Sequence, residues 1–243
     1  MLCMRYNRRM SRRLFLAAVV VTGMVVGVAY YAYQSLRPAL GRTVSLGLWL
    51  RDPQAHPEWA LQAGKRCGTA PFAMPTSGFV GYLWDDRFSS GHRHQGVDIF
   101  GGKDIGMTSV VAAYPGYLTR LPGWKSAVIE RIPSDPLQPG QQIWLYYTHM
   151  ADPAGDSFIS SQFPPGTMDK PIEAGTLLGY QGDYTGDPES PTGVHLHFSV
   201  VKDDGRGGFL NELDIQNTYD PSPYLGLPLN AQTDNGNVVT CGN

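Results

Sequence analysis

The hydropathy of the 243-residue chain is dominated by one long apolar segment near its start. Residues 14–36 carry no charge and consist mainly of Val, Ala, Leu and Tyr. About 20 consecutive apolar residues cross a bilayer as a helix, so this segment predicts a transmembrane anchor preceded by a basic segment, residues 1–13. The positive-inside rule then places the amino terminus in the cytoplasm and the rest of the chain outside. The basic segment contains Arg5, Arg8, Arg9, Arg12 and Arg13.

Two other interpretations of this amino-terminal region are open. A cleaved signal peptide would have the same hydropathy, but no clear small-x-small cleavage site follows the apolar run, which favours an uncleaved anchor. Residues 11–16, Ser-Arg-Arg-Leu-Phe-Leu, resemble a twin-arginine export signal, although the arginines can equally serve only to orient the anchor.

Beyond the anchor, the pattern predicts a domain between two less regular segments. Residues 37–70 are mixed in polarity and interrupted by prolines, which predicts a spacer with at most a short helix near residues 58–62. Residues 227–243 are polar and predict a loosely packed tail. The domain therefore comprises residues 71–226.

Short apolar runs separated by Gly, Pro and Asp are typical of strands and turns, and they fill most of the predicted domain. No 12-residue window after the anchor shows a convincing 3.6-residue period, so few helices are expected. The fold class is therefore mostly β, an antiparallel sheet or sandwich. The predicted strands are residues 79–82, 96–100, 109–113, 127–131, 143–149, 176–180 and 194–201.

Two longer segments of the domain, residues 151–170 and 182–191, lack a strand pattern. Loops of this length in a compact domain tend to be functional or mobile. Because both flank histidine motifs, they could form the walls of a substrate groove, and ordinary surface loops are the alternative.

Charge and cysteine content limit the possible functions. The formal net charge is −2, and without the five amino-terminal arginines the rest of the chain carries about −7, which argues against nucleic-acid binding. Cys67 and Cys241 bracket the exported domain, and in an oxidising exterior they could form a disulfide. Their spacing does not fit a metal site.

Candidate metal ligands lie in two motifs about a hundred residues apart. In an extended strand His94 and Asp98 share a face, and so do His195 and His197, because side chains alternate with period two. Gly96 argues against a helical arrangement of the first pair. Two imidazoles and one carboxylate form a typical open zinc site, with the fourth position left for water.

With their surroundings, these motifs resemble the lysostaphin-like (LytM-type) zinc endopeptidases. The resemblance covers roughly residues 71–226 in order, and HxH alone would be a weak signal. It rests on His94-x-Gly96-x-Asp98, Tyr147-Thr148-His149, Thr192-Gly193-Val194-His195-Leu196-His197-Phe198, residues 72–78, residues 173–179, Tyr219-Asp220-Pro221 and Tyr224-Leu225.

The resemblance implies a duplicated hybrid motif fold and assigns roles to five residues. His94, Asp98 and His197 would bind one zinc ion per domain. His149 and His195 would be the unligated catalytic pair beside the metal-bound water, stabilising the oxyanion and moving a proton to the leaving amine. Residue spacing does not decide which of the two is the base.

Some positions need a separate interpretation. His92 also forms an HxH with His94, but only the register beginning at His94 matches the family, and His56 is interpreted as a solvated loop residue. The family often has an acidic residue after its HxH-Phe run and a Pro before it, where this chain has Ser199 and Val194. Neither position is a ligand, so activity is still expected, with different support around the ligands.

The sequence therefore predicts a membrane-anchored zinc metalloendopeptidase that faces the periplasm or the exterior of a bacterium. By resemblance its substrate is the stem peptide or cross-bridge of peptidoglycan. One alternative is a non-cleaving LytM-like module that binds cell-wall peptide or regulates a partner hydrolase; relatives of that kind usually lack a ligand, and this chain lacks none. Another is cleavage of a protein substrate by the same chemistry.

Overall fold

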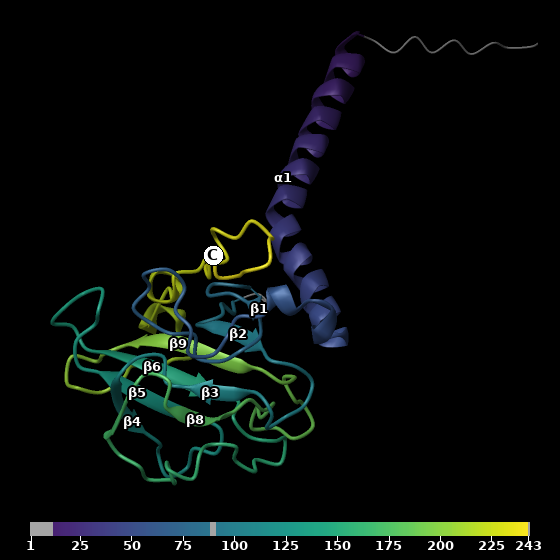
Figure 1. The fold of residues 1–243 in the computed structure, drawn as a ribbon. Coiled ribbons are helices and arrows are strands. Elements are labelled where there is room, and N and C mark those ends of the chain that lie inside the picture. Colours follow the sequence, from purple (N-terminus) through teal and green to yellow (C-terminus); the bar gives the residue numbers. More distant parts are fainter. Residues whose placement is uncertain (1–11, 88–90, 243) are drawn as a thin grey trace, which may run out of the picture.

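A computed structural model describes residues 12–87 and 91–242, so most of the basic segment predicted at residues 1–13 lies outside the described part. Helix α1 (Arg12–Arg51) comes first and projects from a β-domain like a stalk (Figure 1). It is long and apolar enough to cross a membrane, and its most apolar window has a mean hydropathy of 2.0 with none of its residues buried. The fold is thus an antiparallel β-domain preceded by an apolar helix.

The domain is built on one large sheet with strand order β1-β2-β9-β6-β5-β4-β7, with β10 beside β9. A separate pair, β3-β8, forms a smaller sheet, and every named pairing is antiparallel. The strands are β1 (Phe79–Tyr82), β2 (Val97–Phe100), β3 (Ser109–Val111), β4 (Gly116–Thr119), β5 (Val128–Ile132), β6 (Ile143–Thr148), β7 (Lys170–Ile172), β8 (Leu177–Tyr180), β9 (Leu196–Lys202) and β10 (Thr218–Tyr219). Short helices are η1 (Pro53–Ala55), η2 (Pro57–Trp59), η3 (Ile215–Asn217) and α2 (Ser222–Leu225).

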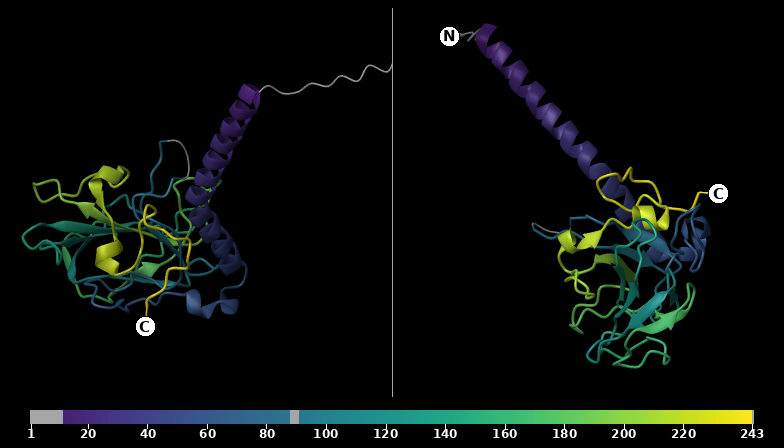
Figure 2. Two further views of the ribbon diagram at one scale, coloured as in Figure 1. Left: turned by 90° about the horizontal axis from the view of Figure 1, so that it is seen from above. Right: turned by 90° about the vertical axis from the view of Figure 1, so that its left-hand side faces the viewer.

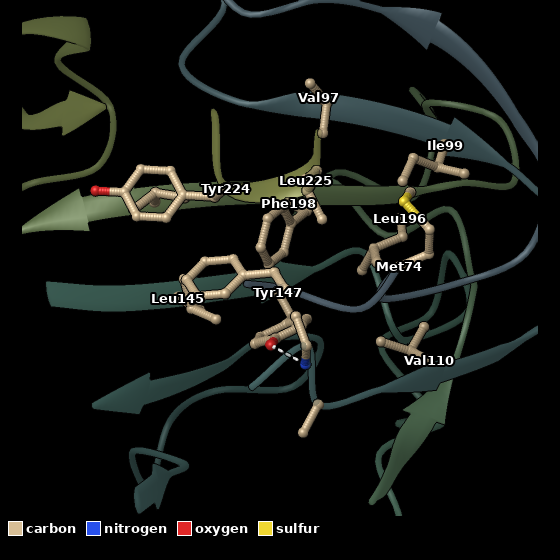
Figure 3. Close-up of a cluster of buried hydrophobic side chains, with 14 of the residues drawn as sticks. Met74, Val97, Ile99, Val110, Leu145, Tyr147, Leu196, Phe198, Tyr224 and Leu225 are labelled. Atoms are coloured by element: carbon tan, nitrogen blue, oxygen red, sulfur yellow. Dashed lines mark hydrogen bonds between the residues drawn. The ribbon is translucent and has the colours of Figure 1, made fainter. Parts of the chain in front are cut away.

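The core lies between one face of the large sheet and the β3-β8 pair. Alternate residues of the central strand β9 enter it, including Leu196 and Phe198, and Val110 of β3 belongs to the same buried cluster (Figure 3). In this core the hydroxyl of Tyr147 accepts a hydrogen bond from the backbone N–H of Ala113. Because side chains alternate along a strand, the residues between the core positions project from the opposite face of the sheet.

All seven predicted strands are present, which confirms the predicted fold class. Strands β4, β7 and β10 were missed: Pro115-Gly116 was interpreted as a turn, β7 is a three-residue edge strand that contains Pro171, and β10 has only two residues. Helices after α1 are indeed short, and the helix expected near residues 58–62 is the single 3-10 turn η2.

The structure differs from the predicted spacer, because α1 continues through Pro38 and packs on the domain. Its last turns bury Leu46 and Trp49 against Phe79 and Phe100. The indole Nε1 of Trp49 donates to the backbone oxygen of Phe100 at 2.7 Å. The i, i+4, i+7 spacing of Arg42, Leu46 and Trp49 is a helical period, so the expectation of no such period after the anchor was wrong for this segment.

A buried arginine joins α1 to both the domain and the carboxyl-terminal segment. Arg42 makes a bidentate contact with Asp86, both N–O distances being 2.7 Å, and its Nε donates to Asp234 at 2.6 Å. Planar two-point contacts of this kind are among the stronger charged hydrogen bonds. The two carboxylates keep the guanidinium charged, and its pKa lies above the usual value although desolvation by burial opposes this.

The carboxyl-terminal segment is packed, contrary to the loosely packed tail that its polarity predicted. Leu227, Leu229 and Val239 are buried in the main core, and Cys67 is bonded to Cys241, which confirms the proposed disulfide. In Figure 2 this segment lies between the domain and α1. Packing therefore extends beyond residues 71–226 on both sides, and the predicted domain limits stay a prediction.

Candidate metal centre

The register of the three central strands brings the two histidine motifs together. Asp98 of β2 is paired with His197 of β9, which is paired in turn with Thr148 of β6. Paired residues present their side chains on the same face, here the face opposite the core. His94 lies in the segment before β2, His195 immediately before β9, and His149 immediately after β6.

Gly96 is required for this convergence. A Cβ atom built on Gly96 would lie 2.3 Å from the backbone oxygen of Phe198 and 2.9 Å from Nε2 of His197. Real Cβ atoms do not approach other atoms so closely, so any side chain here would push the first motif away from β9.

Three buried side chains form a group that could hold a metal ion: His94, Asp98 and His197. Oδ1 of Asp98 lies 3.1 Å from Nε2 of His94 and 2.9 Å from Nδ1 of His197, and these two nitrogens are 3.0 Å apart. Tetrahedral zinc with bonds of about 2.0–2.2 Å separates its ligand atoms by about 3.4 Å. The observed triangle fits zinc after movements of a few tenths of an ångström.

The outer nitrogen of each ligand histidine contacts an oxygen that can only accept. Nδ1 of His94 lies 2.9 Å from the carbonyl oxygen of Leu83, and Nε2 of His197 lies 2.8 Å from Oε1 of Glu212. In the neutral rings that a metal binds, the outer nitrogens therefore carry the protons and the inner nitrogens present lone pairs. In that state two lone pairs and a carboxylate oxygen within about 3 Å repel one another unless a cation lies between them. A metal ion suits this place, and without one a proton on Nδ1 of His197 takes it.

The charged groups around His197 stabilise a positive charge between the three ligand atoms. Burial alone would lower its pKa, but the charge of Glu212 and the hydrogen bond with Asp98 outweigh this and raise the pKa of His197 to about 10. Burial likewise works against ionisation of Asp98, yet the neighbouring histidines, His94 first, hold its pKa well below the usual value. Both carboxylates are thus ionised beside the ligand nitrogens.

His149 and His195 lie beside this group, with ring centroids 4.5 Å apart. Nδ1 of His149 donates to the carbonyl oxygen of Tyr184 at 2.7 Å, and Nδ1 of His195 donates to that of Gly193 at 2.8 Å. Each Nε2 is left with a lone pair, and that of His195 is 3.7 Å from Oδ1 of Asp98. The structure therefore brings together all five predicted site residues.

Both of these histidines are neutral near pH 7. Desolvation by burial, with the neighbouring His195 and His197 adding to it, lowers the pKa of His149 to about 3. Burial also lowers the pKa of His195, against the opposing charge of Asp98. The backbone of His149 has φ 72°, a left-handed conformation that is unfavourable for a residue with a Cβ. Such strain is a recurrent feature of functional sites.

The group opens into a cavity of about 530 Å³. Beside the five site residues, its lining includes the aromatic side chains of Tyr82, Phe100, Tyr146 and Tyr184, the hydroxyl of Thr148 and the aliphatic Leu213. The Phe100 ring stacks on His195 with centroids 4.9 Å apart. Of the two loops for which a groove wall and an ordinary surface loop were both open, residues 182–191 contribute Tyr184 and Thr185 to the lining, whereas residues 151–170 contribute none.

Two site residues have no sequence signal. Glu212 contacts His197 from a loop 15 residues further along the chain, and Tyr184 acts through its backbone oxygen, which any residue type carries. His92 is exposed and belongs to no metal-binding group within residues 12–87 and 91–242. His56 stacks on Trp59, with ring centroids 3.8 Å apart.

In structure the chain is similar to peptidases of the lysostaphin and LytM type, the family that its motifs resemble. These include the lysostaphin catalytic domain from Staphylococcus simulans (21% identity, 60% of this chain and 88% of that one, TM-score 0.39). The catalytic domain of the prophage-encoded M23 protein EnpA from Enterococcus faecalis has 22% identity over 59% of this chain and 94% of that one, with TM-score 0.37.

A third similar structure is a putative glycyl-glycine endopeptidase LytM from Ruminococcus gnavus, with 25% identity over 54% of this chain and TM-score 0.35. The match spans only 45% of that longer chain. No protein-family model and no curated protein matches the chain.

Proposed function

We propose that this chain is a membrane-anchored zinc metalloendopeptidase that hydrolyses peptide bonds in peptidoglycan stem peptides or cross-bridges. The observation that carries the proposal is the convergence of three ligand atoms, on His94, Asp98 and His197, beside two neutral histidines in one cavity. The substrate class follows from the resemblance of the sequence motifs. The apolar half of α1 and the five arginines before it support the proposed cellular location.

A zinc ion bound by His94, Asp98 and His197 would supply Lewis-acid polarisation of the scissile carbonyl and a water of lowered pKa. The chain's own residues then bind and orient the peptide. The aromatic side chains of Tyr82 and Tyr146 line the cavity on either side of the group and offer flat apolar surfaces to the peptide. Thr148 adds a hydroxyl for a polar contact.

His149 and His195 would move the proton. Hydrolysis adds the oxygen of water to the carbonyl carbon, breaks the C–N bond and transfers a proton from the water to the leaving nitrogen. The carbonyl oxygens of Tyr184 and Gly193 keep both Nε2 atoms free to accept that proton. Because burial disfavours the protonated form of His149, the proton passes readily to the amine. The histidine that has accepted the proton would also donate a hydrogen bond to the developing oxyanion.

The test uses the full chain, purified in detergent. Bound zinc is measured by mass spectrometry, and cleavage of purified peptidoglycan is followed with and without a chelator. We expect one zinc per chain and cleavage that the chelator abolishes. His94→Ala should lose the metal. His149→Gln and His195→Gln should keep the metal and lose activity by at least about 100-fold. The exposed His92→Ala is the matched control and should behave as the unmodified chain.

Two outcomes would contradict the proposal in different ways. Full zinc content and full activity in His94→Ala would exclude this residue as a ligand. A zinc-loaded chain that cleaves neither peptidoglycan nor protein substrates would favour the non-cleaving module, which binds cell-wall peptide or regulates a partner hydrolase. Cleavage of a protein but not of peptidoglycan would keep the chemistry and change the substrate.

A further inference from the structure

We infer that Glu212 is a positioning residue of the metal centre: it holds the His197 ring in the orientation and tautomer that binding of a metal through Nδ1 requires. The inference rests on the proposed function, because it concerns the same site. It adds a residue that neither the motifs nor the spacing of the histidines identifies.

The contacts of Glu212 carry this inference. Its Oε1 accepts from Nε2 of His197 at 2.8 Å and from the hydroxyl of Ser199 at 3.0 Å. His197 and Ser199 are two positions apart on β9, so they project from the same face of the sheet. Ser199 is fully buried, and only 13% of the Glu212 side chain is exposed. Oε1 of Glu212 thus connects the ligand His197 to Ser199, the next residue of β9 on the same face of the sheet.

This arrangement determines which ring nitrogen can bind the metal. A carboxylate accepts hydrogen bonds and donates none, so the proton of the neutral His197 ring must lie on Nε2. Nδ1 then presents its lone pair toward Asp98 and His94. A carboxylate behind a ligand histidine also raises the basicity of the ligand nitrogen, and losing such a partner typically weakens metal binding by about 10–100-fold.

The loop that carries Glu212 is attached to the other ligand motif. The side-chain amide of Gln95, which is buried next to His94, donates to the backbone oxygen of Leu213 at 2.8 Å. The side chain of Asn217 donates to the backbone oxygen of Asn211 at 2.8 Å. Contacts of the residues before and after Glu212 in the chain therefore fix the position of its carboxylate.

The experiment measures the zinc dissociation constant of the full chain in detergent by competition with a chelator. We expect Glu212→Ala to weaken zinc binding by about 10–100-fold. Glu212→Gln should weaken it less, because the amide oxygen can still accept from Nε2 of His197. Asp214→Asn is the matched control: it removes a negative charge two residues away, on an exposed side chain whose Oδ1 accepts from the backbone N–H of Gln216. Asp214→Asn should change the zinc affinity by less than about twofold.

A second measurement separates positioning from a general loss of structure. Nitrogen-15 NMR of histidine-labelled protein distinguishes the two ring tautomers, and we expect the Nε2–H form of His197 in the zinc-bound chain and in Glu212→Gln. The inference is overturned if Glu212→Ala and Glu212→Gln keep the unmodified affinity, or if Asp214→Asn loses as much as Glu212→Gln. A chain that binds no zinc at all, in any variant, would instead overturn the proposed function and this inference with it.

Discussion

The backbone of His149 combines a strained conformation with a side chain that the proposed chemistry needs. At φ 72° a residue with a Cβ costs about 1–2 kcal/mol relative to the right-handed region, whereas glycine adopts this conformation freely. Strand β6 ends at Thr148, and the left-handed residue turns the chain so that the imidazole reaches the carbonyl oxygen of Tyr184.

We therefore expect His149→Gly to be more stable to unfolding than His149→Ala by about 1 kcal/mol, although both lack the imidazole. Denaturant unfolding of the two variants in the same detergent measures the difference. Equal stability, or a more stable alanine variant, would show that the backbone at this position carries no strain in solution.

Glu130 is a buried acid away from the metal centre. Its Oε2 accepts from the hydroxyl of Tyr147 at 2.7 Å, and its Oε1 has no hydrogen-bond partner within the described residues. Desolvation raises the pKa of Glu130 to about 8, with the Tyr147 hydrogen bond opposing the shift. Between pH 4.5 and 8 the folded state therefore holds a proton that the unfolded state releases, and stability falls as the pH rises through this window.

Glu130→Gln should remove this slope. We expect the unfolding free energy of the unmodified chain to drop by about 3–5 kcal/mol from pH 4.5 to pH 8, and that of Glu130→Gln to drop much less. Glu173→Gln, at an exposed position, is the control and should retain the slope. A pH dependence unchanged in Glu130→Gln would contradict the assignment of the slope to this residue.

Among single residues, the sequence indicated those whose chemistry depends on a rare side chain. His94, Asp98, His195 and His197 were identified because imidazoles are few and the spacing within each motif is even, whereas His149 was identified through the resemblance to LytM-type peptidases. Glu212 was not identified, because nothing in the sequence distinguishes it from the other acidic residues. Its contact with His197 forms only when its loop folds back onto β9. The expectation that support around the ligands would differ came from Ser199 and Val194, and it did not point to Glu212.

At the scale of elements, alternation along the strands determined what could be predicted. Strands with several apolar residues were found, whereas β4 and β7, at the edge farthest from the site, have too few apolar residues for a pattern. The carboxyl-terminal half of α1 was missed because Pro38 suggested an end to the helix. A proline removes one backbone hydrogen bond, and the packing of the following turns against β1 outweighs that loss.

The contact between α1 and β1 also supports the cavity wall formed by Phe100. Trp49 is 3% exposed and donates to the backbone oxygen of Phe100, the residue whose ring stacks on His195. We expect Trp49→Ala to lower the unfolding free energy of the domain by about 3–5 kcal/mol and to reduce peptidase activity. Leu48→Ala, at a position that is 44% exposed on the same helix, should change stability by less than about 0.5 kcal/mol. Denaturant unfolding measures the change in stability, and peptidoglycan cleavage measures the change in activity. Equal losses in Trp49→Ala and Leu48→Ala would contradict the role given to Trp49.

At the scale of the whole molecule, the sequence predicted five successive segments, and the structure packs the last three, residues 37–70, 71–226 and 227–243, against one another. The anchor and the β-domain were recognised from local hydropathy. Their attachment depends on Arg42 finding Asp86 and Asp234, residues 44 and 192 positions away. The pairing of Cys67 with Cys241 is the exception among the long-range contacts, because few exported cysteines leave few possible partners.

The continuous helix α1 limits how far the active site can reach. With its apolar half in a bilayer, as proposed, no flexible tether separates the membrane from the β-domain, since the next turns of the same helix are packed on β1. A compact domain of roughly 190 residues has a radius of gyration of about 16 Å and hence a diameter of about 40 Å. Under the proposed function, cleavage is therefore confined to a layer a few nanometres deep above the lipid surface, and peptides must come to the membrane to be cut.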